Sequence, residues 1–333
     1  MTQVSRRSFN ILAASLSLSL GLGGCAHHRL TTGRLPRVGY LTGDKFPTLV
    51  AAFRQEMRAL GYVEGENIVL EMRQGRPNSS DGAAHVTELA AMDLDVIVVA
   101  ALPYALELQR LKSHTPIVVA TGPGLISNGL AHSMERPGGN VTGMDELPPG
   151  LTGKRLRLLK EAAPHLSRVA LLSTTPGRGG HQVQLSDAES AAPALGLIVR
   201  PYRATNLAEL QTALARLLDD GMEGFVSFQG GLALVNRDMI VDFARQNRLP
   251  AIYQSRLFVE AGGLMSYAPD QEEQFRIAAR YVDKILKGAP AGDLPIMHPA
   301  RYFLSINSAA ATAIGLTFSP GLIGQADNVM RSS

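Results

Sequence analysis

Short apolar runs alternate with longer amphipathic stretches along most of the chain. In its first half, apolar runs predict strands at residues 37–42, 67–72, 95–100, 116–121 and 140–144. Apolar residues spaced three and four apart predict helices at residues 47–60, 80–92, 103–112 and 125–134. Strands that alternate with helices through short loops form a parallel sheet covered on both faces. The pattern therefore predicts a first α/β lobe.

The same alternation resumes after a proline-rich link at residues 147–150. Strands are expected at residues 168–172, 197–202, 224–228, 249–253 and 264–267, and helices at 152–163, 181–195, 207–219 and 232–247. A helix at 271–287 and short elements at 302–306, 308–314 and 322–330 are too small for a third core, so we expect them to pack on the two lobes.

The predicted fold class is therefore α/β, with two doubly wound, Rossmann-like lobes and a cleft between them. We expect residues 37–145 with 270–293 to form the first lobe, and residues 151–268 with 294–330 to form the second. Several chain crossings between lobes allow the cleft to close on a ligand by rigid-body motion. Pro269 stands at one of these crossings.

The N-terminus has the pattern of an export signal. Residues 1–7 are basic, residues 8–21 form an apolar run too short for a comfortable membrane span, and Leu-Gly-Gly precedes Cys25, the only cysteine. We expect a signal peptide over residues 1–24 and a tether over 25–36. The run before Cys25 resembles a bacterial lipobox, which predicts a protein anchored by lipid to a membrane at the periplasmic or cell-surface side. An ordinary signal peptide with an incidental Cys25, and export by either the general or the twin-arginine route, stay open.

Composition narrows the function classes. The chain is 45% hydrophobic and 18% charged, as in globular proteins, and its formal net charge is +3. Two basic residues, Arg6 and Arg7, lie in the leader, so the remaining chain is nearly neutral and no nucleic-acid partner is expected. The histidines lack metal-ligand spacing and G-x-S-x-G is missing, so we expect no metal, no cofactor and no enzyme activity.

Five stretches, taken together, resemble one known family. They are GYVEGENI at 61–68, RPGGNVTG at 136–143, GKRL at 153–156, FVEAGGLMSY at 258–267 and YVDKILKG at 281–288. In order and spacing they resemble ABC transporter substrate-binding proteins of the tryptophan/tyrosine-binding type, which have a type I periplasmic-binding fold. The resemblance implies an extracytoplasmic receptor that captures a small molecule in the cleft and hands it to a membrane permease of an ABC importer, without catalysis. A sensory module that presents its ligand to a signalling partner is the alternative.

The candidate ligand-binding residues follow the predicted strands, where open α/β sheets bind ligands. They are Thr42, Asp44, Ala101, Thr121, Ser173, Thr174, Gln229, Tyr253, Gln254 and Tyr267. The chain departs from the family pattern at Ala101-Leu102-Pro103, where Gly-Thr-Pro is usual, so a hydroxyl is lost there. Two acidic positions of the family are also replaced, one of them by Gly230. Such acids bind an ammonium group, so their replacement argues against an aromatic amino acid as the ligand. The expected ligand class is an amino acid or a similar small polar or aromatic solute, and its identity stays open.

Overall fold

A computed structural model describes residues 34–43, 47–77, 79–174 and 179–331. The predicted signal peptide, most of the tether, Cys25 and Asp44 lie outside these residues. From Leu35 onward the chain forms one compact unit. No helix in the described part of the chain is long and apolar enough to cross a membrane.

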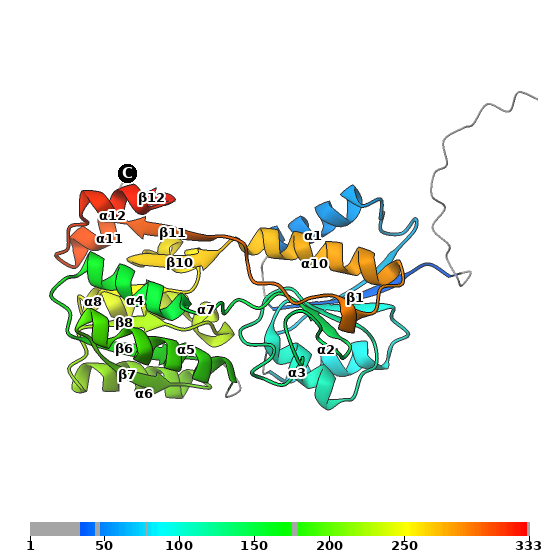
Figure 1. Ribbon diagram of the computed structural model, residues 1–333, viewed down its shortest axis with the longest axis horizontal. Helices are drawn as coiled ribbons and strands as arrows, with labels where there is room; N and C mark the ends of the chain where they lie inside the picture. Colours follow the sequence, from blue (N-terminus) through cyan, green and yellow to red (C-terminus); the bar gives the residue numbers. More distant parts are fainter. Residues whose placement is uncertain (1–33, 44–46, 78, 175–178, 332–333) are drawn as a thin grey trace, which may run out of the picture. The chain divides into compact units, whose positions relative to one another are not determined.

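The first sheet has five parallel strands among the described residues, in the order β2-β1-β3-β4-β5. The strands are β1 (Arg37–Thr42), β2 (Val69–Gln74), β3 (Val96–Val99), β4 (Ile117–Val119) and β5 (Val141–Gly143). The helices that cover it are α1 (Pro47–Ala59), α2 (Ser80–Ala91), α3 (Leu102–Arg110) and α10 (Gln271–Leu286). Figure 1 shows α10, which comes after most strands of the second sheet in the chain, lying beside α1.

The second sheet has seven strands in the described residues, in the order β12-β11-β10-β9-β8-β6-β7. Its strands are β6 (Arg168–Ser173), β7 (Ile198–Arg203), β8 (Gly224–Ser227), β9 (Ala251–Tyr253), β10 (Met265–Pro269), β11 (Tyr302–Asn307) and β12 (Asn328–Met330). Only the β10–β11 pair is antiparallel among the described pairs. Its helices are α4 (Leu151–Ala162), α5 (Gly179–Ala191), α6 (Leu207–Asp219), α7 (Gly231–Val235), α8 (Arg237–Gln246), α9 (Arg256–Glu260), α11 (Ser308–Ala313) and α12 (Pro320–Gln325).

Helices cover both faces of each sheet. Because successive residues of a strand point to opposite sides, consecutive residues of the central strands are all buried. In β3, Val96 and Val98 pack with α1 and α10, whereas Ile97 and Val99 pack with α2 and α3. This is why the central strands read as continuous apolar runs and not as alternating ones. The predicted fold class, two α/β lobes with mainly parallel sheets, is confirmed.

The structure departs from three predicted helices: one does not form, one ends early and one is divided. Residues 125–134 form turns, since the Asp145 carboxylate accepts from the backbone N–H groups of Gly124 and Leu125 and Gly129 has a positive φ of 76°. The predicted helix over 322–330 stops early because its last residues pair with β11 as β12. The predicted helix over 232–247 is divided into α7 and α8 at Asn236.

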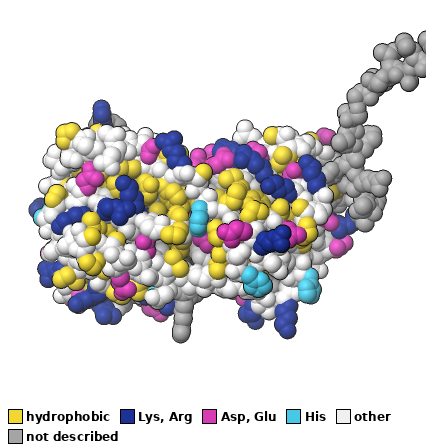
Figure 2. All heavy atoms as spheres, in the orientation of Figure 1, with side chains coloured by type: hydrophobic (Ala, Val, Ile, Leu, Met, Phe, Trp, Pro, Cys, Tyr) yellow, Lys and Arg dark blue, Asp and Glu magenta, His cyan; other side chains and the backbone are white. Residues whose placement is uncertain are grey.

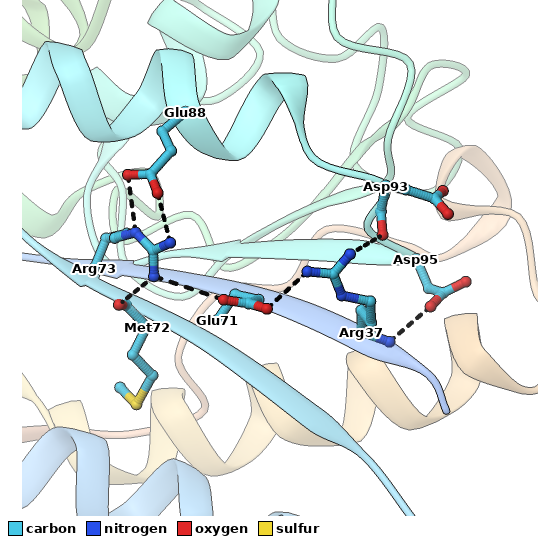
Figure 3. Close-up of polar contacts among 7 residues, drawn as sticks. All are labelled: Arg37, Glu71, Met72, Arg73, Glu88, Asp93 and Asp95. Atoms are coloured by element: carbon cyan, nitrogen blue, oxygen red, sulfur yellow. Dashed lines mark hydrogen bonds and ion pairs between the residues drawn. The ribbon is translucent and has the colours of Figure 1, made fainter. Parts of the chain in front are cut away.

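A chain of charged side chains ties the edge of the first sheet together (Figure 3). Arg37 Nη2 lies 2.7 Å from Glu71 Oε1. Arg73 donates from Nε and Nη2 to the two carboxylate oxygens of Glu88 on α2. The backbone N–H of Arg37 donates to Asp95 at 2.7 Å. These contacts link β1, β2, α2 and the start of β3, so they favour the observed register at a sheet edge where backbone pairing ends.

Two crossing segments between the sheets lie side by side. Met144 forms an isolated parallel bridge with Met297, and the Asp145 N–H donates to the Met297 carbonyl at 2.9 Å. Farther along, the Tyr302 hydroxyl donates to the Glu146 carbonyl at 3.1 Å. The connection between the sheets is therefore a hydrogen-bonded pair of segments at this point.

Candidate ligand-binding cavity

A cavity of about 400 Å³ opens where strands of the two sheets end. The first sheet contributes Thr42 at the end of β1, Ala101 after β3 and Thr121 after β4, while Gln229 and Gln254 follow β8 and β9. These positions are the carboxyl ends of parallel strands, where open α/β sheets bind ligands. The volume and the position of the cavity are both typical of a small-molecule site.

Most of the cavity wall is apolar. The apolar lining residues are Leu49, Pro77, Ala100, Ala101, Leu102, Pro103, Pro123, Leu207, Leu232, Leu234, Val235 and Phe275. Val235 and Leu207 are exposed at 47% and 46%, so apolar surface reaches the outside of the cavity. An apolar body on the ligand is what such a wall would desolvate favourably.

Three buried polar side chains of the wall have atoms that lack hydrogen-bond partners in the described structure. These atoms are the Thr42 hydroxyl, the Glu146 Oε1 and both amide atoms of Gln254, on residues that are 1%, 5% and 5% exposed. A buried polar group without a partner costs free energy, so native proteins seldom retain one unless a ligand or water satisfies it. These atoms therefore mark where a bound molecule would make hydrogen bonds.

A chain of three polar side chains lies at the inner end of the cavity. Gln229 donates from Nε2 to a Glu146 carboxylate oxygen at 3.1 Å and accepts at Oε1 from Arg155 Nη2 at 3.4 Å. Arg155 also donates from Nε and Nη2 to the Tyr267 carbonyl at 3.0 and 2.9 Å. Glu146 and Gln229 line the cavity, whereas Arg155 stands behind them and is 0% exposed.

Burial favours the uncharged forms of Glu146 and Arg155, so it raises the pKa of the acid and lowers the pKa of the guanidinium. Burial, and to a smaller extent the Asp145 charge, raises the pKa of Glu146 against the opposing effects of the hydrogen bond from Gln229 and of the Arg155 charge. Burial lowers the pKa of Arg155 to about 10, so the guanidinium stays protonated at neutral pH. Gln229 therefore hydrogen-bonds to both Glu146 and Arg155, whose opposite charges compensate each other in the protein interior.

The predicted site residues divide into two groups. Thr42, Ala101, Thr121, Gln229 and Gln254 line the cavity together. Asp44 lies outside the described residues. Ser173, Thr174, Tyr253 and Tyr267 lie in the described part of the chain but are not among the residues that line the cavity.

Those four residues have structural surroundings instead. Tyr253 is fully buried in the core and stacks on Phe258 with ring centroids 4.6 Å apart. The Thr174 hydroxyl accepts from the backbone N–H of Ala233 at 3.2 Å, which supports the start of α7. Ser173 is fully buried at the end of β6, and the Tyr267 carbonyl is the acceptor for Arg155.

Sequence reasoning missed several residues of the wall and its support. Glu146 lies directly before the proline-rich link, and an acid placed at a crossing between lobes was the available signal. Arg155 occurs within the family-like stretch 153–156, where a cation stands among leucines on the buried side of α4. Asn206, Gln271 and Phe275 come from the starts of α6 and α10, and no sequence signal pointed to them.

The described residues hold no group of three or more His, Cys, Asp or Glu side chains that could bind a metal. On the face shown in Figure 2, basic and acidic side chains are interspersed around hydrophobic ones. The cavity can bind and enclose a small molecule through hydrogen bonds from its polar side chains and apolar contacts from its walls.

A doubly wound lobe on each side of a ligand-sized cavity defines the class of two-lobed solute-binding proteins with the type I periplasmic-binding fold. The sequence profile of the ABC transporter substrate binding protein family matches residues 39–330. The chain therefore belongs to this family, as its motifs predicted. Members of the family are solute-binding proteins, not enzymes, and act outside the cytoplasm.

Known relatives agree with this assignment. The chain is 21% identical over 299 residues to the tyrosine-binding protein of Clostridioides difficile (strain R20291), covering 86% of this chain and 85% of the relative. A conserved domain protein from Vibrio cholerae superposes with a TM-score of 0.81 at 22% identity, over 89% of this chain and 100% of that one. The ABC domain in complex with L-Trp from Streptococcus pneumonia gives a TM-score of 0.79 at 21% identity, over 88% and 100%.

Proposed function

We propose that this protein is the receptor of an ABC-type importer, which captures a small solute in the cavity and delivers it to a membrane permease. The observation that carries the proposal is the cavity of about 400 Å³ with the partnerless Thr42 hydroxyl and Gln254 amide on its wall. The relatives named for tyrosine and L-Trp support a solute of amino-acid size. A small polar or aromatic molecule is the proposed ligand class.

The proposed mechanism is closure of two lobes, residues 37–145 with 270–293 and residues 151–268 with 294–330. The hydrogen-bonded crossing segments near Met144 and Met297 would serve as the hinge, and Pro269 ends β10 at a further crossing. A ligand that touches both lobes binds the closed form better than the open one and so shifts the equilibrium toward closure.

The proposed contact residues are the predicted Thr42, Ala101, Thr121, Gln229 and Gln254. The structure adds Glu146 to this proposed set, because it lines the same cavity and bonds to Gln229. Ser173, Thr174, Tyr253 and Tyr267 would act from behind the wall by holding strand ends and helix starts in place.

We further propose that the mature protein begins at Cys25 and is held to the membrane by lipid on that residue. The support is the export-signal pattern of residues 1–24. Detergent phase partitioning and intact-mass measurement of protein from cell membranes test this, with Cys25→Ser as the matched variant. A wild-type protein that lacks an added lipid mass and stays in the aqueous phase would refute the anchor.

Native mass spectrometry of the gently purified protein, followed by small-angle scattering with the molecule found, tests the receptor function. We expect a co-purified small molecule and a smaller radius of gyration when it is bound. Absence of compaction at saturation would refute closure. Uptake of that molecule by cells lacking the protein separates transport from sensing: lost uptake supports the importer, and intact uptake with a lost cellular response supports the sensory alternative.

A further inference from the structure

One carboxylate on the cavity wall has an oxygen without a hydrogen-bond partner. Glu146 lines the inner end of the cavity and is 5% exposed. Its Oε2 accepts from Gln229 Nε2 at 3.1 Å, whereas its Oε1 is buried and has no partner in the described structure. A buried carboxylate oxygen without a donor is costly, because it loses its hydration and gains no bond in return. Oε1 therefore marks a place where a ligand would donate a hydrogen bond.

The described side chains around Glu146 do not supply this donor. Gln274 of α10 lies near the carboxylate, but both of its amide atoms also lack partners in the described structure. Arg155 donates from Nε and Nη2 to the Tyr267 carbonyl and from Nη2 to Gln229, and its Nη1 has no partner there. The last torsion of a glutamate side chain is broad, so the carboxylate of Glu146 can turn Oε1 toward the cavity. A donor can reach the oxygen from that side.

The charges next to Glu146 leave the inner end of the cavity negative. Asp145 is also 5% exposed, and its carboxylate adds a second negative charge. Arg155 supplies one buried positive charge, so two carboxylates face one guanidinium when both acids are ionised. An excess charge in a desolvated place attracts a cation more strongly than it would in water. Burial raises the pKa of Glu146, and a cation beside this acid would lower that pKa again.

Asp145 itself is committed to the backbone. Its carboxylate oxygens accept from the N–H groups of Gly124 and Leu125 at 2.9 Å each and from that of Leu147 at 3.0 Å. Among the described residues that line the cavity, Glu146 is the one carboxylate. A ligand cation would therefore meet the negative charge of the inner end at Glu146.

We propose that Glu146 binds a protonated amino group of the ligand and makes this receptor selective for amines. The ammonium donates to Oε1 and offsets the second carboxylate, while the apolar wall contacts the body of the molecule. This inference rests on the proposed receptor function and names the ligand class of the same cavity. It reverses the sequence-based argument against an ammonium, which considered acids replaced after the strands, such as the one at Gly230, and not the segment between the sheets.

Matched pairs of indole compounds test the proposal by isothermal titration calorimetry at neutral pH. Tryptamine has an ammonium where tryptophol has a hydroxyl, and L-tryptophan differs from indole-3-lactate in the same way. Phenethylamine with 2-phenylethanol, and L-phenylalanine with 3-phenyllactate, are two further pairs with a smaller ring. Because hydrogen bonds between charged groups are the stronger ones, we expect the amine to bind at least about tenfold more tightly than the alcohol in each pair that binds. An alcohol that binds as tightly as its amine would overturn the inference.

The variant Glu146→Gln separates this role from a structural one. It removes the charge and keeps the size of the side chain, so the preference for the amine should fall about tenfold while affinity for the alcohol changes by less than about threefold. Glu189→Gln makes the same chemical change at an exposed position of α5 and should leave the preference unchanged. An unchanged preference in folded Glu146→Gln would overturn the role of Glu146. If that variant does not fold, Glu146→Asp withdraws the charge by one methylene, and an unchanged preference there has the same consequence.

The outcomes also separate this inference from the receptor function. If none of the pairs binds, the molecule that co-purifies decides: one with an amino group supports the inference, and one without overturns it. A molecule without an amino group that compacts the protein would leave the receptor function intact while refuting this inference. No co-purified molecule, together with no compaction by any tested compound, would refute both.

Discussion

Replacing Gln254 with Met should stabilise the ligand-free protein while removing ligand binding. Both amide atoms of Gln254 lack partners, and the residue is 5% exposed on the cavity wall. An unsatisfied buried polar group costs about 1–3 kcal/mol, and Met fills a similar volume without that penalty. We therefore expect the free energy of unfolding to rise by about 1–2 kcal/mol in Gln254→Met. The same substitution removes the proposed amide contact, so ligand affinity falls.

Urea denaturation of ligand-free protein, followed by circular dichroism, gives the stability, and calorimetry with the co-purified molecule gives the affinity. The chain contains no tryptophan, so fluorescence of an indole probe reports binding without background from that residue. Gln182→Met is the control, because Gln182 is an exposed amide on α5 and its replacement should change neither quantity. A Gln254→Met protein that is less stable than wild type when ligand-free would show that the amide is satisfied in the free protein. Unchanged affinity would refute its role as a ligand contact.

Three further predictions concern the frame around the cavity. Gly143→Ala should lower the free energy of unfolding by about 2–4 kcal/mol, because a Cβ there would lie 2.1 Å from the Val119 carbonyl oxygen at a φ of 129°; a loss below about 1 kcal/mol in urea denaturation would contradict this. Glu88 has its pKa lowered from 4.5 to about 2, first by the hydrogen bond from Arg73, so its stabilisation is present above pH 4.5 and is lost as the pH falls toward 2. The stability difference between wild type and Glu88→Gln should therefore shrink over that interval, and a constant difference would refute the assignment. Arg155→Met leaves the acid that it balances uncompensated and should cost about 3–5 kcal/mol, with Arg155→Lys recovering only part of the loss because lysine cannot reproduce the paired hydrogen bonds; full recovery in Lys would show that charge alone matters.

The lobes were predictable because their signal is local. Strands such as β3 are short continuous apolar runs, and helices such as α10 show apolar residues at helical spacing, so both types of element could be read from neighbouring residues. Helix 125–134 was predicted wrongly because a distant carboxylate, that of Asp145, satisfies the backbone N–H groups where the helix would begin. Local periodicity carries no information about such a partner.

Two neighbouring residues, Tyr253 and Gln254, show what the sequence could not predict about the site. Tyr253 ends β9 and Gln254 follows it, and both were predicted to face the cleft. Consecutive residues of an extended segment point to opposite sides. Tyr253 enters the core, where it stacks on Phe258, and Gln254 lines the cavity. Alternation predicts that the two should differ, but only the packing of the sheet decides which one faces the core.

By itself, the sequence determined the α/β class, the position of candidate residues after the strands, and the family. Only the tertiary structure brought Glu146, Gln229 and Arg155 together, because the contacts that join them span 83 and 74 positions in the chain. The alternating pattern reports which residues are buried, since burial follows from hydrophobicity and period. It does not report which buried charges meet, because that depends on how elements far apart in the chain pack against one another.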